Sequence, residues 1–231
     1  MYVYLDIETS GLNKTSFLLQ LSAISEKQHT FDIYIKPPCA LNQECTNLTG
    51  LSYINNTLYK DGVPLHAVGP YMALLSFYHW TESLRKEGET LDLIGYNSNA
   101  FDVPVLVLAY AKFRQTLPTF NECYDVLPVI RKLQKTDDKL AKTKIKLEDL
   151  GRFYLPDSEI MSKANFHNSL FDCEILKQVT EKICEDKKTK ISDEFGFYKK
   201  PFEYFVDKYY TPRVVNNFDP IVSSTFVFNT L

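Results

Sequence analysis

Short apolar runs separated by turn signals limit the fold of this chain more than any other feature. The first three runs are rich in β-branched and aromatic residues and cover residues 2–7, 17–25 and 29–36. That composition is typical of strands, and the short connections predict an antiparallel meander. The third run ends at Pro37 and Pro38, because proline cannot donate a hydrogen bond to a neighbouring strand.

Helices and strands then alternate along the chain. Apolar residues within 66–86 roughly follow helical spacing, and we expect a helix there. Further helices are expected over residues 103–114, 126–133, 147–154 and 169–184. Apolar runs at 91–95 and 120–124 lie between these helices and are expected to be strands, whereas residues 39–64 show no clear periodicity. Strands followed by alternating strands and helices predict an α/β domain with a mixed sheet.

Length and composition favour one globular domain with an addition at its C-terminal end. The 231 residues are 45% hydrophobic and 24% charged, which excludes a disordered chain, a collagen-like fibre and a coiled coil. The longest apolar run, residues 103–111, is too short to span a bilayer, so we expect no membrane partner. We expect a main domain over residues 1–185 and an aromatic-rich extension over 186–231. The extension should pack on the domain, because about 45 residues would be only marginally stable alone.

The cysteines and the first residues of the chain predict the cellular compartment of the protein. The five cysteines form no C-x-x-C pair and are odd in number, which predicts reduced thiols. Acidic residues stand at positions 6 and 8, where a signal peptide would need a basic start and an apolar stretch. We therefore expect an intracellular protein, either cytoplasmic or nuclear.

Asp6 and Glu8 form the first informative constellation. On a strand, residues i and i+2 point to the same face, so these two carboxylates project together. Two carboxylates at short range repel one another unless a cation or a shared proton lies between them. Ligand sets made only of oxygen favour Mg²⁺ or Mn²⁺ over zinc. The alternative is a strand whose acidic residues simply face solvent.

Two later positions carry further carboxylates. Asp102 follows the predicted strand 91–95, at the edge where an open α/β sheet places its ligand groups; the alternative is a cap for the next helix. Asp172 lies in the first turn of the last predicted helix, shortly after His167. The alternatives are that Asp172 only favours the helix N-terminus and that His167 is an ordinary surface histidine.

These residues carry a family resemblance. The patterns Asp-x-Glu with Thr and Gly-Leu after it, Asn-x4-Asp and His-x4-Asp occur in this order and resemble the three motifs of the DEDDh superfamily of 3′→5′ exonucleases. The resemblance covers roughly Tyr2 to Cys184, and residues 46–52 and 97–106 are most similar to the three-prime repair exonuclease branch. It implies an RNase H-like fold, with a mixed five-stranded sheet flanked by helices. The implied metal ligands are Asp6, Glu8, Asp102 and Asp172, with His167 as the general base.

The expected cofactor is a pair of divalent cations, Mg²⁺ or Mn²⁺, about 3.5–4 Å apart at the scissile phosphate. Asp6 is expected to bridge both cations. Glu8 and Asp172 would complete the site that holds the nucleophilic water, and Asp102 would support the second cation. The imidazole of His167, with an ordinary pKa of about 6.5, can accept the proton of that water near neutral pH. The expected product is a nucleoside 5′-monophosphate.

Recognition of the 3′ end is expected from the residues that follow the first motif. They are Thr9, Ser10, Gly11 and Leu12. The resemblance implies that backbone amides here hold the 3′-hydroxyl and that Leu12 wedges against the terminal base; the alternative for Leu12 is a core residue. Asn97 and its neighbour Tyr96 are expected to contact substrate, and the alternative for Asn97 is that it only shapes its turn.

Three positions depart from the family pattern. Ser10 stands where Thr is usual, Tyr96 where His often precedes the Asn, and Ser169 where a small Ala is typical. None of these changes removes a metal ligand or the base. We therefore expect an active site, with any effect falling on the fit of the substrate.

The densest basic segment runs from Arg131 to Lys146. It holds seven basic residues against Asp137 and Asp138, whereas the whole chain has a net charge of −3. A mildly acidic chain has no general attraction to nucleic acid, so local patches must supply it. This segment is either a solvated loop or helix face, or a surface that tracks phosphates.

Three functions are compatible with these residues. The first is a 3′→5′ deoxyribonuclease that acts on single-stranded or frayed DNA 3′ ends. The second is an exoribonuclease, because no residue that would read the 2′-hydroxyl is visible. The third is a catalytically silent exonuclease fold that only binds nucleic acid, although such a scaffold need not retain five costly polar groups. The sequence does not decide between a monomer and a homodimer.

Overall fold

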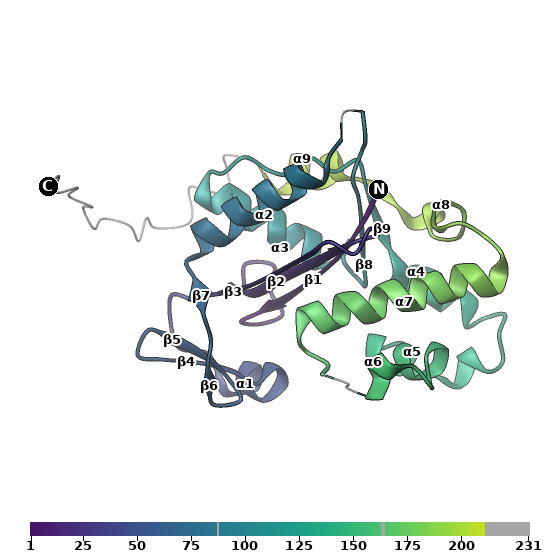
Figure 1. The fold of residues 1–231 in the computed structure, drawn as a ribbon, viewed down its shortest axis with the longest axis horizontal. Coiled ribbons are helices and arrows are strands. Elements are labelled where there is room, and N and C mark those ends of the chain that lie inside the picture. Colours follow the sequence, from purple (N-terminus) through teal and green to yellow (C-terminus); the bar gives the residue numbers. More distant parts are fainter. Residues whose placement is uncertain (87, 163–164, 211–231) are drawn as a thin grey trace, which may run out of the picture.

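A seven-stranded mixed sheet forms the centre of the computed structural model, which describes residues 1–86, 88–162 and 165–210 (Figure 1). The strands lie in the order β10 (Lys200–Pro201), β9 (Glu122–Asp125), β8 (Asp92–Gly95), β1 (Tyr2–Thr9), β2 (Leu18–Ser25), β3 (Thr30–Ile35) and β7 (Ala67–Val68). β1, β2 and β3 form an antiparallel meander, and β8 and β9 add parallel to β1.

The five predicted strands and their mixed pairing are confirmed, but the sheet is wider than predicted. β7 and β10 extend its two edges by pairing with β3 and β9. Each has only two residues, so neither leaves a periodic pattern in the sequence. Pro201 can belong to β10 because that strand lies at an edge, where no further ladder bond is required.

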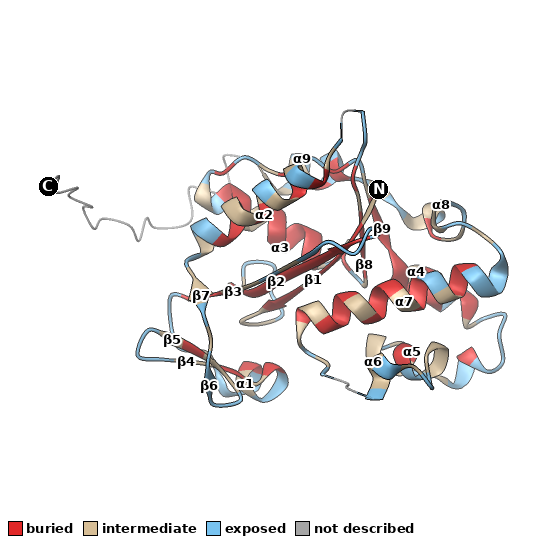
Figure 2. Ribbon diagram, in the orientation of Figure 1, coloured by how far each residue is buried: buried red, intermediate tan, exposed pale blue. Residues whose placement is uncertain are grey.

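Helices cover both faces of the sheet. On one face lie α2 (Pro70–Leu84), α3 (Asp102–Phe113) and α9 (Phe202–Tyr209), and on the other α4 (Val126–Leu133), α5 (Leu147–Tyr154) and α7 (Ser169–Lys187). The predicted helices within 66–184 are thus confirmed to within a few residues at their ends. Figure 2 shows that their buried sides face the sheet.

Side chains that alternate along β1 contribute to two separate hydrophobic cores, one on each face of the sheet. Val3, Leu5 and Ile7 pack against the layer of α2 and α3, whereas Tyr4 packs with α4 and α7. Because side chains alternate along a strand, Asp6 and Glu8 share the α7 face with Tyr4. The strand therefore buries its apolar residues on one side and presents its carboxylates to the other helical layer.

A small second sheet occupies the region where the sequence predicted no element. It consists of β4 (Leu51–Ile54), β5 (Thr57–Lys60) and β6 (Val63–Pro64), preceded by α1 (Gln43–Thr49). Gly50 ends α1 with φ 69°, and a Cβ there would lie 2.3 Å from an oxygen of Asp61. Any other residue would strain this left-handed turn and displace the Asp61 carboxylate.

The chain after residue 185 continues through α8 (Ile191–Glu194), a 3₁₀ turn (Gly196–Tyr198), β10 and α9. Phe195 is buried beside α7, and Phe202 and Phe205 are buried beside α3. The predicted domain boundary at 185 remains a prediction, and residues 211–231 of the predicted extension lie outside the described residues. None of the described helices is long and apolar enough to cross a membrane.

Candidate active site

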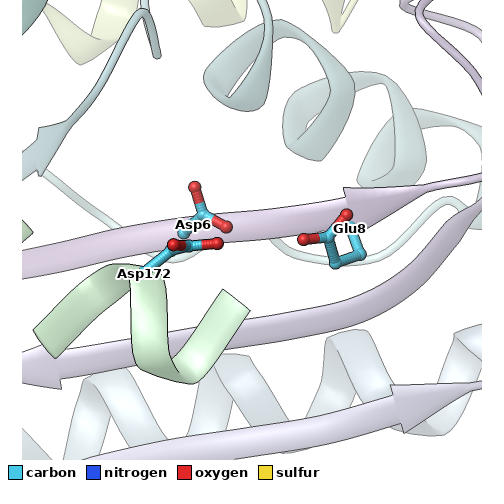
Figure 3. A group of neighbouring side chains, drawn as sticks. All are labelled: Asp6, Glu8 and Asp172. Atoms are coloured by element: carbon cyan, nitrogen blue, oxygen red, sulfur yellow. The ribbon is translucent and has the colours of Figure 1, made fainter. Parts of the chain in front are cut away.

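Three carboxylates from two elements meet at the C-terminal end of β1. Asp6 and Glu8 come from β1, and Asp172 comes from the first turn of α7 (Figure 3). One oxygen from each of the three lies within 4.8 Å of the other two. The structure therefore brings together residues that are more than 160 positions apart in the sequence.

A polar network fixes the start of α7 against β2. Asn168 caps the helix with its side-chain oxygen. The backbone N–H of Ser169 donates to the side-chain oxygen of Gln20 at 3.2 Å, and the Ser169 hydroxyl lies 2.6 Å from that of Ser22. The serine at position 169, a departure from the family pattern, is thus fully buried with a hydrogen-bond partner. The network holds Asp172 opposite β1.

Asp102 is the first residue of α3 and lies beside Asp6, outside the group of three. It is buried, with 6% of its surface exposed. The residue before the helix is Phe101, whose side chain makes no capping bond, so Asp102 does not occupy the cap position. The carboxylate accepts a hydrogen bond from the backbone of Ile7, on the strand that carries the first motif.

Burial raises the pKa of every carboxyl in this cluster, and repulsion between members of the cluster adds to it at Asp6 and Glu8. Burial is the largest cause at Glu8, where the charge of Asp172 adds to it and the pKa reaches about 8. Burial likewise raises the pKa of Asp102 and of Asp172 to about 7. For Asp6 the pKa is raised well above its ordinary value by burial and then by the other three carboxylates.

The donor set fits a divalent cation. Near neutral pH such carboxyls require either protons or a positive charge among them. All the donors are oxygens, which suits Mg²⁺ or Mn²⁺. The acidic cluster is therefore a candidate metal centre.

The backbone of His167 lies at this cluster, while its side chain is exposed. Its N–H donates to Oδ2 of Asp172 at 3.1 Å, and its φ of 62° is unusual for a residue with a side chain. Partial burial is the largest cause of a lowered imidazole pKa, and the nearby charges of Lys60 and Lys146 lower it further against an opposing effect of Glu148. Within the described residues, the imidazole makes no hydrogen bond to a carboxylate of the cluster.

Lys60 is a charged residue at this site that the sequence did not reveal. Its ammonium donates to the backbone oxygens of Thr49 at 2.5 Å and of His167 at 3.4 Å. Its charge also lowers the pKa of Glu8 against the effect of burial. Lys60 ends β5, inside a region without periodicity, so no pattern in the sequence pointed to it.

The loop after β1 leaves the predicted wedge residue in solvent. Leu12 is 84% exposed, so the alternative that it is a core residue is wrong. The Thr9 hydroxyl donates to the Gly11 oxygen at 2.6 Å, and the Ser10 hydroxyl accepts from the Phe17 N–H at 3.0 Å. These bonds close the loop around its own backbone. The predicted contacts of Thr9, Ser10, Gly11 and Leu12 with a 3′ end remain predictions.

The turn after β8 is shaped by Asp125, which the sequence analysis did not single out. This buried carboxylate accepts from the N–H groups of Asn97 at 2.9 Å and Asn99 at 3.2 Å, and it caps α4. Asn97 adopts φ 60° with its side chain exposed, so it shapes the turn and remains free to contact substrate. The Tyr96 hydroxyl donates to the backbone oxygen of Ile145.

The basic segment Arg131–Lys146 runs from the end of α4 through a 3₁₀ turn (Leu140–Lys142) to the cap position of α5. The side-chain amide of Gln134 donates to the backbone oxygens of Leu140 and Thr143, which closes the segment into a loop. The loop side chains Lys142, Lys144 and Lys146 are exposed. Both predicted interpretations, solvated loop and phosphate-tracking surface, remain open.

Fold and site together define an RNase H-like α/β domain with an acidic cluster on its first strand and its last long helix. This is the class that the DEDDh motifs predicted, and the solved structures bear it out. The exonuclease I–single-stranded DNA complex of E. coli, a zinc-bound form, aligns with a TM-score of 0.61 and 16% identity over 83% of this chain. Exonuclease X bound to duplex DNA with a 5′ overhang aligns with a TM-score of 0.56 and 12% identity.

A curated relative supports the same class from the sequence. Exonuclease DPD1, chloroplastic/mitochondrial, of Arabidopsis thaliana is 26% identical over 193 residues, which are 81% of this chain. The chain spans 57% of that relative and 42% of exonuclease I, but aligns with 98% of exonuclease X. No protein-family model matches the chain. The resemblance to DEDDh exonucleases is confirmed, and the closer likeness to the three-prime repair branch remains a prediction.

Proposed function

We propose that this chain is a metal-dependent 3′→5′ exonuclease that releases nucleoside 5′-monophosphates from DNA 3′ ends. The observation that carries the proposal is the convergence of Asp6, Glu8 and Asp172 within 4.8 Å, with buried Asp102 beside them. Four carboxyls with raised pKa values in one place would only destabilise a domain without a cationic ligand.

The cluster would hold two divalent cations, Mg²⁺ or Mn²⁺. Asp6 would contact both, Glu8 and Asp172 would complete one position, and Asp102 would support the other. Cations bound there would lower the pKa of the attacking water and stabilise charge on the phosphate oxygens. His167 would accept the proton of the water, since its lowered pKa keeps the imidazole neutral near physiological pH.

The substrate would be the 3′ end of a single strand or a frayed duplex. Exposed Leu12 would wedge against the terminal base, and the loop amides around Gly11 would hold the 3′-hydroxyl. The DNA bound in the exonuclease I and exonuclease X complexes favours DNA over RNA. The five free cysteines suit a reducing compartment inside the cell.

Digestion of matched 5′-labelled DNA and RNA oligonucleotides with Mg²⁺ or Mn²⁺ tests the proposal. We expect the DNA to shorten from its 3′ end, with release of nucleoside 5′-monophosphates that EDTA and Asp6→Asn both abolish. A higher kcat/KM on RNA would identify an exoribonuclease. Binding of either strand without hydrolysis would identify a catalytically silent module.

A further inference from the structure

Lysine and aromatic side chains alternate along one surface of α9. The ammonium of Lys200 lies 4.6 Å from the ring centroid of Tyr204, and that of Lys208 lies 5.5 Å from Tyr204 and 5.4 Å from Tyr209. Lys14 continues the row, 5.3 Å from the Tyr209 centroid and 3.1 Å from its hydroxyl oxygen. We call these five residues the α9 row.

Within the described part of the chain, the cations of the α9 row have no carboxylate partner. Among the residues that the structure describes, none of the three ammonium groups lies within 4.0 Å of a carboxylate. All three lysines lower the pKa of the Tyr204 hydroxyl. The largest cause is the hydrogen bond from Lys208, followed by the charges of Lys200 and Lys208 and by a smaller effect of Lys14. Glu203 and Asp207 are exposed on the same helix, but neither appears among the causes of that lowered pKa.

The helix holds this row rigidly. Phe202 and Phe205 are buried on the inner side of α9, against the layer that contains α3. Tyr204 is 41% exposed on the outer side. An exposed ring on an anchored helix can accept a stacked base without first ordering its own backbone.

The row begins in the loop that follows β1, the strand that carries Asp6 and Glu8. Lys14 belongs to the loop after β1, two residues beyond the exposed Leu12, and its contact with Tyr209 joins that loop to the end of α9. This route lies on the α2–α3 side of the sheet, whereas the basic segment Arg131–Lys146 adjoins α4 and α5 on the other (Figure 1). A strand whose 3′ end reaches Leu12 could therefore continue along α9.

We propose that the α9 row is a binding surface for the 5′-ward part of the single DNA strand whose 3′ end is being hydrolysed. The proposal rests on the proposed function for the position of the 3′ end. Ammonium groups would contact successive phosphates, and the exposed ring of Tyr204 would stack on a base. Neither contact reads base identity, so the surface would tolerate any sequence.

Binding and turnover of the full chain test this surface. The variants are Tyr204→Ala and the pair Lys200→Gln with Lys208→Gln. The matched control is Lys27→Gln with Lys190→Gln, which removes the same charge: Lys27 follows β2, at the end of the sheet opposite Glu8, and Lys190 precedes α8. Fluorescence anisotropy with labelled oligothymidylate, in EDTA so that no hydrolysis occurs, gives Kd against salt concentration.

We expect the α9 lysine pair to flatten the log–log salt slope by up to about 1.4, from about 0.7 for each phosphate contact on a single strand. Tyr204→Ala should weaken binding roughly 5-fold, the lower end of the range for one stacked base. With Mg²⁺, both should raise KM for a long strand while kcat for a trinucleotide stays at the wild-type value. The control pair should change neither the salt slope nor KM.

Unchanged Kd, salt slope and KM in the α9 variants, with an active wild-type enzyme, would overturn the proposed surface and leave the exonuclease function standing. Equal losses in the control pair would also overturn it, since the effect would then be one of net charge. Failure of the wild type to hydrolyse any strand would instead count against the proposed function. In that case the anisotropy measurement still decides whether the row binds DNA.

Discussion

Replacing Asp6 by Asn should stabilise the metal-free protein at high pH. One carboxylate oxygen each from Asp6, Glu8 and Asp172 lies within 4.8 Å of the other two. Two like charges at that distance repel by about 1–3 kcal/mol for an effective dielectric constant between that of water and about 20. Asparagine keeps the shape of the side chain and removes the charge, so the free energy of unfolding should rise by about this amount.

The sign of the pH dependence follows from the pKa values. Glu8 and Asp172 have folded-state pKa values of about 8 and about 7, above their ordinary values of 4.5 and 3.8. The folded state therefore binds more protons than the unfolded state between these values, and the wild type loses stability as pH rises from about 4 to about 8. The stabilising effect of Asp6→Asn should be near zero at pH 5 and largest at pH 9.

Thermal melting in EDTA measures this effect. A chain of this size gains about 2–4 °C in Tm for each kcal/mol, so we expect the variant to melt about 2–12 °C above wild type at pH 9. Saturating Mn²⁺ should reverse the order, because a ligand at 100 times its Kd stabilises the wild type by about 2.7 kcal/mol. Asp157→Asn, at an exposed position after α5, is the matched control.

The reasoning would be refuted by a variant that melts below wild type by the same margin at pH 5 and pH 9. Asp6 would then be a structural hydrogen-bond partner and not one member of a repelling group. An equal gain in Asp157→Asn would show that the stabilisation comes from overall charge and not from repulsion within the cluster.

Three further changes probe the base, its neighbour and the basic segment. His167→Ala should lower kcat about 10²–10⁴-fold, and near-wild-type turnover in this variant would contradict a role of His167 as the base. The wild-type activity should fall at acidic pH with a midpoint below 6.5, since burial and nearby lysines lower the imidazole pKa. Lys60→Met should move that acidic limb to higher pH, because the Lys60 charge lowers the same pKa, and an unmoved limb would count against this coupling. Replacing Lys142, Lys144 and Lys146 with Gln should raise KM for long strands at unchanged kcat. It should also flatten the log–log salt dependence of binding by up to ~0.7 per lost phosphate contact. An unchanged KM and an unchanged salt dependence would identify the segment as a solvated loop.

Periodicity explains which parts of the fold could be predicted. The alternation of β1 separates Val3, Leu5 and Ile7 from Asp6 and Glu8, and the same alternation is readable in the sequence. The helix over 126–133 was predicted with the bounds that the structure shows, since its apolar residues recur at helical spacing. An element that buries one face therefore leaves a periodic pattern of apolar residues in the sequence.

Segments too short to show a period gave no such signal. The strands around Lys60 have two to four residues each, too few to show a period. The place of Lys60 beside His167 depends on how that small sheet packs against the rest of the chain. The α9 row was missed for a related reason: its residues belong to two segments, and only the contact of Lys14 with Tyr209 joins them.

The departure at position 169 shows why a family pattern alone cannot judge a substitution. A serine in place of alanine adds a buried hydroxyl, which would cost about 1–3 kcal/mol without a hydrogen-bond partner. In this chain the hydroxyl of Ser22 supplies that partner from β2, at 2.6 Å, and itself donates to Asp32 at 2.7 Å. The two serines are far apart in the sequence, so their compensation is visible only in the fold. The start of α7, and with it the position of Asp172, therefore depends on a residue of β2 that none of the three motifs contains.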